Sequence, residues 1–375
     1  MKKYIVIALA ALVAFAACTK VNPEKKADRI SFTVANFMPA TKAYTSLLDE
    51  TTSFNCKAYL HADGEETAQD YFGADGEIIS ANNETDPSEW LPSHEYFWPK
   101  SANSYINFLA WYNSSDVTIG NFQVLESVIK YTNIEITGNS NIIIAEKAWY
   151  YKQNRTSEEN DEETGHEDAF GQNSVTGGVP MLFHHMLAKV SVKAKAAKVQ
   201  GGSDNKTSWD ITISNAKIIN VGETAGAANF SFRTPTTTVP QITPIVGVWQ
   251  SVNHDAEIAL TDSGVLTTTA EDLLAEYSVF PQSLNLTSTP AKLEFDLTIV
   301  NKYDGVEYGH ETIHESIALA TLKNKATEEA IKEWAMNTKY TYTIVVDPET
   351  ETIKFDPAVV AWDVVEAEEI EVPTL

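Results

Sequence analysis

Residues 292–299 read Lys-Leu-Glu-Phe-Asp-Leu-Thr-Ile, and this stretch decides the fold because apolar and polar residues alternate through it without interruption. Successive side chains of a β-strand point to opposite faces, so the alternation places Leu293, Phe295, Leu297 and Ile299 on one face. The other face carries charged or hydroxyl groups. The stretch therefore predicts a strand with one side in a core and the other in water.

The same period of two recurs along the chain. Its apolar positions are Ile30, Phe32 and Val34; Val190, Val192, Ala194 and Ala196; Ile211 and Ile213; and Tyr340, Tyr342, Ile344 and Val346. Many such half-buried antiparallel strands predict an all-β protein made of sandwiches. The best helical signal is residues 327–337, where Thr327 is an N-cap candidate and Glu328 and Glu329 would lie in the first turn.

The N-terminus has the layout of an export signal. Lys2 and Lys3 precede an apolar run over residues 5–17, which is shorter than the ~20 residues of a spanning helix. Small residues and then Cys18 end the run, so we expect residues 1–17 to be a lipoprotein signal peptide and the sulfur of Cys18 to carry lipid. Residues 18–28 would then be a lipid-tethered linker. An ordinary signal peptide followed by a chance cysteine is the alternative.

Charge and cysteine content restrict the partners and the chemistry. The 375 residues carry a formal net charge of −25, which repels phosphate backbones and disfavours nucleic acid as a partner. Cys56 is the only cysteine besides Cys18, so the exported chain has no intramolecular disulfide, and its apolar neighbours favour a buried packing role.

Four local patterns then carry a family resemblance. They are Tyr96-Phe97-Trp98-Pro99 followed by the aromatic stretch 105–112, Phe183-His184-His185-Met186-Leu187-Ala188-Lys189-Val190, Val279-Phe280-Pro281-Gln282, and Tyr340-Thr341-Tyr342-Thr343-Ile344 followed by Val360-Ala361-Trp362. In this order, and with the lipid signal, the sequence resembles the fimbrillins, the pilus subunits of the Bacteroides kind.

The resemblance implies two tandem transthyretin-like Greek-key β-sandwich domains. A loop-rich stretch gives way to a regular strand near residues 181–188, so we place the domains at 29–185 and 186–375. The resemblance also implies a structural or adhesive pilus component without enzymatic activity or cofactor. Such a protein would be lipid-anchored and exposed on the cell outer membrane and in the fimbrium. Its partners would be other pilus subunits and a ligand on a host or bacterial surface.

Assembly by strand exchange is a further implication of the resemblance. The first strand, with Ile30, Phe32 and Val34, would be removed with the lipid anchor by cleavage after Lys42, where the family usually has arginine. An extended C-terminal segment of the next subunit would fill the vacated groove, through backbone hydrogen bonds and alternate side chains. Residues 363–375 are the candidate donor strand, with Ile370 and Val372 on one face.

Two alternatives remain open at this point. A stand-alone surface lipoprotein that binds glycan or protein would never polymerise. A zinc metalloprotease would use His310-Glu311-x-x-His314, since two histidines four residues apart on a helix can share one zinc. The hairpin signal Asp304-Gly305 and the neighbouring strand-forming residues favour a strand instead. In a strand the two histidines would be about 13 Å apart, so we predict no metal site here.

Overall fold

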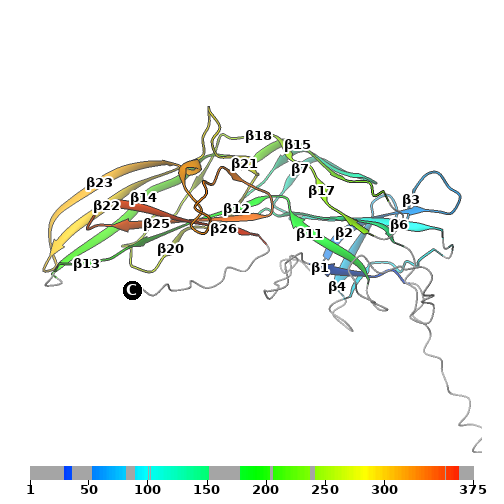
Figure 1. The fold of residues 1–375 in the computed structure, drawn as a ribbon, viewed down its shortest axis with the longest axis horizontal. Helices are drawn as coiled ribbons and strands as arrows, with labels where there is room; N and C mark the ends of the chain where they lie inside the picture. The colour runs from blue at the N-terminus through cyan, green and yellow to red at the C-terminus, as the bar shows by residue number, and fades with distance from the viewer. Residues whose placement is uncertain are drawn as a thin grey trace, which may run out of the picture.

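The computed structural model describes residues 29–35, 53–81, 89–99, 101, 103–151, 178–202, 206–236, 241–350 and 352–362. Every regular element within these ranges is a β-strand, apart from one 3₁₀ turn at Leu319–Thr321. The all-β prediction is therefore confirmed. The molecule is elongated, and its first and last strands lie toward opposite ends (Figure 1).

Seven strands near the N-terminus close into a ring, which we call the N-terminal ring. They are β1 (Phe32–Ala35), β2 (Ser53–His61), β4 (Glu77–Ala81), β5 (Trp90–Pro92), β6 (Tyr105–Asn113), β9 (Ile142–Ala145) and β11 (Val179–His185). Hydrogen-bonded neighbours run β6-β9-β11-β1-β5-β4-β2, and β2 pairs back with β6. β3 (Gln69–Asp70), β10 (Lys147–Tyr151) and β16 (Gln241–Thr243) extend the same sheet. Alternate side chains, among them Phe32, Phe54 and Phe108, fill its interior.

Two sheets at the other end form the C-terminal sandwich. One sheet contains β20 (Glu271–Val279), β12 (Ala188–Ala196), β25 (Thr338–Asp347) and β26 (Thr352–Ala361). The other contains β13 (Gln200–Gly201), β14 (Thr207–Val221), β22 (Lys292–Tyr303), β23 (Val306–Ala318) and β19 (Ala256–Ala259). The alternating apolar residues predicted for β12, β14, β22 and β25 make up much of the shared core. Period-two patterning thus located the strands because each has one buried face.

Another five-stranded sheet lies against the outer surface of the ring. It contains β17 (Ile245–Val246), β15 (Thr224–Phe232), β8 (Val128–Glu135), β7 (Thr118–Leu125) and β18 (Trp249–Asn253). Its Tyr131 and Phe230 share a core with Leu109 and Trp111 of the ring strand β6. The pairings β8–β15 and β10–β16 join strands from before and after residue 185. The division into domains at residues 185 and 186 stays a prediction.

The helix predicted for residues 327–337 is wrong. Glu328 and Asn337 have φ angles of 59° and 58°, outside the right-handed helical region. Glu333–Trp334 forms β24, which pairs with β21 (Gln282–Ser283). The Trp334 side chain is only 1% exposed, and its indole N–H donates to the Tyr342 hydroxyl at 3.0 Å. Burial of one tryptophan in the sandwich thus outweighs weak local helix propensity.

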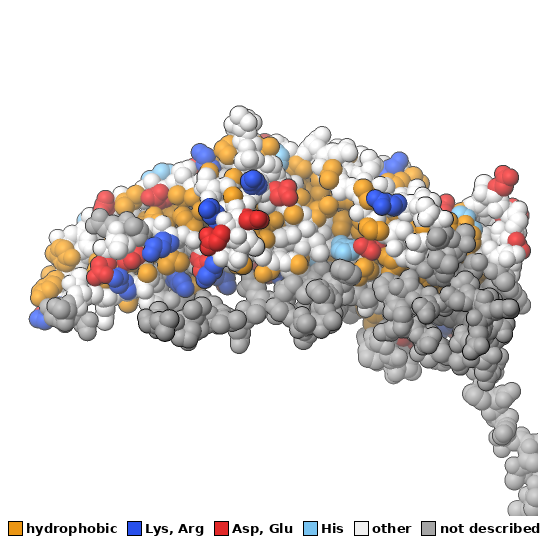
Figure 2. All heavy atoms as spheres, in the orientation of Figure 1, with side chains coloured by type: hydrophobic (Ala, Val, Ile, Leu, Met, Phe, Trp, Pro, Cys, Tyr) orange, Lys and Arg blue, Asp and Glu red, His pale blue; other side chains and the backbone are white. Residues whose placement is uncertain are grey.

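Charges of both signs occur on the face shown in Figure 2, including the part over the C-terminal sandwich. Glu276, for example, lies 2.8 Å from the amines of both Lys189 and Lys339. Neighbouring cations therefore offset part of the acidic excess locally. Among the described residues, no helix has the length and apolar character that crossing a bilayer requires.

Candidate functional site

Strand β1 closes the N-terminal ring, and its place between β11 and β5 is the candidate site. It runs parallel to β11, with Phe32 opposite Val179, and antiparallel to β5, with Phe32 opposite Trp90. The Ile30 N–H donates to the Tyr96 carbonyl at 2.8 Å, and the Val179 N–H donates to the Ser31 carbonyl at 2.8 Å. β1 and the two residues before it are therefore bound through their backbone on both edges.

Side chains of β1 and of the residues just before it fill the ring interior. Ile30 and Phe32 are both 0% exposed, and Val34 packs against the same core while partly buried. The Phe32 ring meets Phe108, Phe54 and Phe72 edge-on, with centroids 5.3, 6.3 and 6.3 Å away. The structure thus brings the predicted residues Ile30, Phe32 and Val34 together in one core. We call the space that β1 and these side chains fill, between β11 and β5, the acceptor groove.

The wall of the acceptor groove opposite β11 is anchored by one buried carboxylate, Glu77 on β4. Its Oε1 accepts from the Tyr96 hydroxyl at 2.7 Å and lies 2.9 Å from Nδ1 of His94, and its Oε2 accepts from the Ser93 hydroxyl. Burial would raise the pKa of this carboxyl, but the hydrogen bonds from Ser93, Tyr96 and His94 hold its pKa below the usual value. Residues 93–97 are therefore held by the ring itself as well as by β1.

The free cysteine lies inside the ring. Cys56 on β2 is 0% exposed and belongs to the same core as Phe32. Burial raises the pKa of its thiol well above the ordinary value. The predicted packing role for Cys56 is confirmed by this environment, which makes the thiol unreactive while the ring is closed.

The described part of the chain ends at Trp362, which is fixed between the two halves of the molecule. The Trp362 indole stacks on the His185 imidazole, with centroids 4.0 Å apart, and the backbone N–H of Trp362 donates to the Asn337 carbonyl at 2.8 Å. The pKa of His185 lies well below its usual value because of burial, then because of the nearby positive charges of Lys189 and Lys339. The segment that follows Trp362 therefore starts from a defined position.

Several predicted site residues lie outside the described residues: Cys18, Lys42, Ile370 and Val372. Glu77 was not predicted from the sequence, because nothing in an acidic chain separates one glutamate from the others. Gly178 was not predicted either, although a glycine directly before the strand-like run 179–185 is a signal of close backbone approach.

The His-Glu-x-x-His motif lies in the middle of strand β23, as its strand-forming neighbours predicted. His310 Nδ1 is 3.0 Å from a Glu307 carboxylate oxygen, and His314 Nδ1 is 2.8 Å from an Asp296 oxygen. Each imidazole thus meets its own carboxylate, and the i,i+4 spacing of a strand separates the two. The described residues contain no group of three or more His, Cys, Asp or Glu side chains placed to hold a metal ion.

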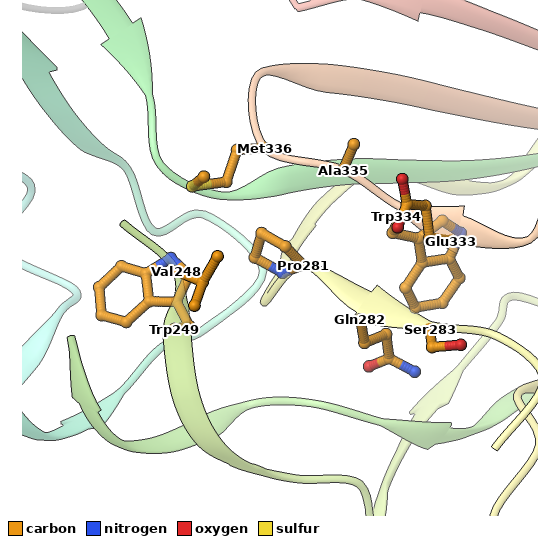
Figure 3. Close-up of a pocket in the computed structure, with 9 residues that line it drawn as sticks. All are labelled: Val248, Trp249, Pro281, Gln282, Ser283, Glu333, Trp334, Ala335 and Met336. Carbon is orange, nitrogen blue, oxygen red and sulfur yellow. The ribbon is translucent and has the colours of Figure 1, made fainter. Parts of the chain in front are cut away.

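A shallow cavity of about 360 Å³ lies where β18, β21 and β24 meet. Among the residues that line this cavity, Trp249 and Trp334 lie on opposite sides of Pro281 (Figure 3). Both tryptophans are nearly buried, and their indole N–H groups donate to the Met186 carbonyl and the Tyr342 hydroxyl. Neighbouring Gln282 accepts from the Gly222 N–H at 2.7 Å. The aromatic and polar groups that line the cavity thus mostly form hydrogen bonds within the protein, which leaves little free surface for a sugar ring.

Fold and groove define a structural β-protein whose N-terminal core is completed by a short strand from the start of the described chain. The chain belongs to the fimbrillin-like family, whose sequence model matches residues 41–362. The predicted family is therefore confirmed. Members are structural pilus proteins, and this chain is a fimbrial protein rather than an enzyme.

Solved structures give further similarities. A fimbrial protein from Bacteroides vulgatus shares 15% identity at a TM-score of 0.47, covering 89% of this chain and 100% of that one. A fimbrilin from Porphyromonas gingivalis shares 10% identity at a TM-score of 0.38, covering 90% of this chain and 98% of that one. No curated protein matches the sequence.

Proposed function

We propose that this chain is an outer-membrane lipoprotein precursor of a pilus subunit that polymerises by β-strand exchange. In this proposal β1 leaves the acceptor groove, and residues 363–375 of a neighbouring copy take its place. The observation that carries the proposal is the position of β1, a four-residue strand whose two flanking strands, β5 and β11, are far from it in sequence. No hairpin among the described residues ties β1 to the ring, so one cut between β1 and β2 separates it covalently.

Lys42 falls between β1 and β2 in the sequence, as this scheme requires. Cleavage after Lys42 would release a fragment that carries both β1 and lipidated Cys18. The remaining chain would lose its anchor and expose Phe54, Phe72 and Phe108, which Phe32 now covers. Exposed aromatic surface drives capture of a replacement strand, because burial of each large apolar side chain contributes about 1.5–3 kcal/mol.

Residues 363–375 suit the donor role by their position after Trp362. Fully extended, they reach about 45 Å. Ile370 and Val372 would enter the interior of the ring of the next subunit, while Glu371 between them faces water. Glu366 and Glu368 lie on the same face as Ile370, so they would stay in water beyond the groove or meet cations. In the same proposal the N-terminal ring and the C-terminal sandwich correspond to two tandem transthyretin-like domains of the family.

The test compares the intact chain, the cleaved chain and a chain without residues 363–375. Mass spectrometry of the surface protein first distinguishes lipidated Cys18 from a new N-terminus at Ala43. Cleavage after Lys42 should then give oligomers by light scattering, and removal of residues 363–375 should abolish them. A cleaved protein that keeps its fold and stays monomeric would contradict exchange and support the stand-alone binding lipoprotein.

A further inference from the structure

Gly178 lies directly before β11, where the backbone of Ser31 and Phe32 passes close to it. A Cβ atom added there would lie 2.5 Å from the Phe32 nitrogen, 2.6 Å from the Phe32 Cα and 2.6 Å from the Ser31 carbonyl carbon. All three are backbone atoms, which cannot move aside by a change of rotamer. The backbone of Gly178 itself has no left-handed φ, so space and not conformation requires glycine here.

The clash does not depend on the side chains that the inserted strand carries. Any strand that accepts the hydrogen bond from Val179 and follows the path of β1 brings its backbone to the same place. We propose that Gly178 is the position at which the acceptor groove admits a strand, and that its partner is the bare backbone of residues 363–375 of a second copy. The identity of that partner rests on the proposed function, whereas the requirement for glycine rests on the present contact with β1.

Other glycines of the ring play a different part. A Cβ on Gly76 would lie 2.6 Å from the Cys56 carbonyl oxygen, which belongs to a strand that stays in the ring throughout. A Cβ on Gly178, by contrast, would meet the backbone of Ser31 and Phe32, in the segment proposed to leave. Gly309 on β23 is the matched control, because a Cβ there would meet nothing within 4 Å.

Cys56 supplies a reporter for the state of the groove in the intact chain. Its thiol is buried in the core that β1 closes, so it reacts with a maleimide only when the ring opens. The experiment uses a soluble chain that begins at Thr19 and therefore has no other cysteine. Gly178→Ala should label about tenfold faster than the parent chain, since overpacking of this size weakens the seating of β1. Gly309→Ala should label at the parent rate, and equal rates for all three chains would overturn the inference.

A second measurement separates this inference from the proposed function. Peptides of residues 29–36 and 363–375 are titrated against protein cut after Lys42 and freed of β1, with and without Gly178→Ala. Weaker binding of peptide 29–36 to the variant supports the role of Gly178, even if peptide 363–375 binds neither protein and the proposed donor fails. If peptide 363–375 binds the cut parent protein and the cut Gly178→Ala variant equally well, its role as the donor strand is supported and the role of Gly178 is overturned. If the cut protein does not fold, the labelling rates of Cys56 decide the question.

Discussion

The N-terminal ring and the C-terminal sandwich both have apolar cores, but their strands are joined in different ways. In the sandwich, β22 and β23 form one long hairpin that turns at Asp304-Gly305 and pairs from Tyr303 to Lys292. In the ring, β1 pairs with β11 over only four residues, from Phe32 to Ala35. A long hairpin cannot be exchanged without unfolding it, whereas a short strand held by sequence-distant neighbours can be replaced by another of similar shape. The ring is thus the half of the molecule in which one short strand can be separated from its neighbours.

Truncation of Phe32, at the centre of the acceptor groove, should produce the largest difference in stability between the ring and the sandwich. Phe32→Ala removes a fully buried ring, and Phe→Ala changes in cores cost about 3–5 kcal/mol. Hydrogen exchange should accelerate in β2, β6 and β11 and stay unchanged in β14 and β22. Phe295→Ala, which removes a fully buried ring from the sandwich, should give the reverse pattern. Uniform acceleration in both halves would show that the two cores unfold as one unit.

Loss of the carboxylate behind the groove wall should have a smaller effect, again confined to the ring. Glu77→Ala leaves the partners on Ser93, His94 and Tyr96 unmatched, which costs about 1–3 kcal/mol. Folding lowers the pKa of Glu77, so its contribution is present above the unfolded value of 4.5 and is lost as pH falls through the lower folded value. Exchange rates of the amides at residues 93–97 measure the effect. Glu77→Gln, which keeps an acceptor oxygen, should retain part of the protection.

A buried lysine predicts a dependence on pH of the same sign, but at higher pH. Lys147 on β10 is 0% exposed, donates to the Glu126 carbonyl and lies 3.3 Å from the centroid of the Trp149 ring. Burial lowers its pKa from 10.5 to about 7, with partial opposition from the charge of Glu126. Between these values the unfolded chain binds more protons, so stability should rise with pH by at most about 1.4 kcal/mol per unit.

Chemical denaturation of the parent chain and of Lys147→Met at several pH values from 7 to 10 measures this slope. The variant should lose most of it, because methionine fills a similar volume and does not titrate. A slope that survives the substitution would assign the pH dependence to other groups.

The smallest effect is expected on the outer strand of the sandwich. His314 is exposed on β23, where its imidazole lies 2.8 Å from the Asp296 carboxylate, so His314→Ala should change the free energy of unfolding by less than about 0.5 kcal/mol. Elemental analysis of purified protein should give the same zinc content before and after the change. Stoichiometric zinc that disappears with His314 would revive the metalloprotease alternative.

The sequence by itself determined the strands that have one buried face. Alternation predicted β12, β14, β22 and β25, because a side-chain period of two leaves a direct trace in the residues. It also singled out Ile30, Phe32 and Val34, and the ordered motifs identified the family. All of these signals are local, so no tertiary contact was needed to find them.

Only the tertiary structure decided where those strands go. It placed β1 parallel to β11, across most of the N-terminal half of the sequence, and it made Glu77 the anchor of the groove wall. It also converted the predicted helix at 327–337 into an extended segment, because Trp334 is buried in the sandwich. Contacts between distant residues decide each of these outcomes, and the free energy of such contacts outweighs local propensity without leaving any pattern in the sequence.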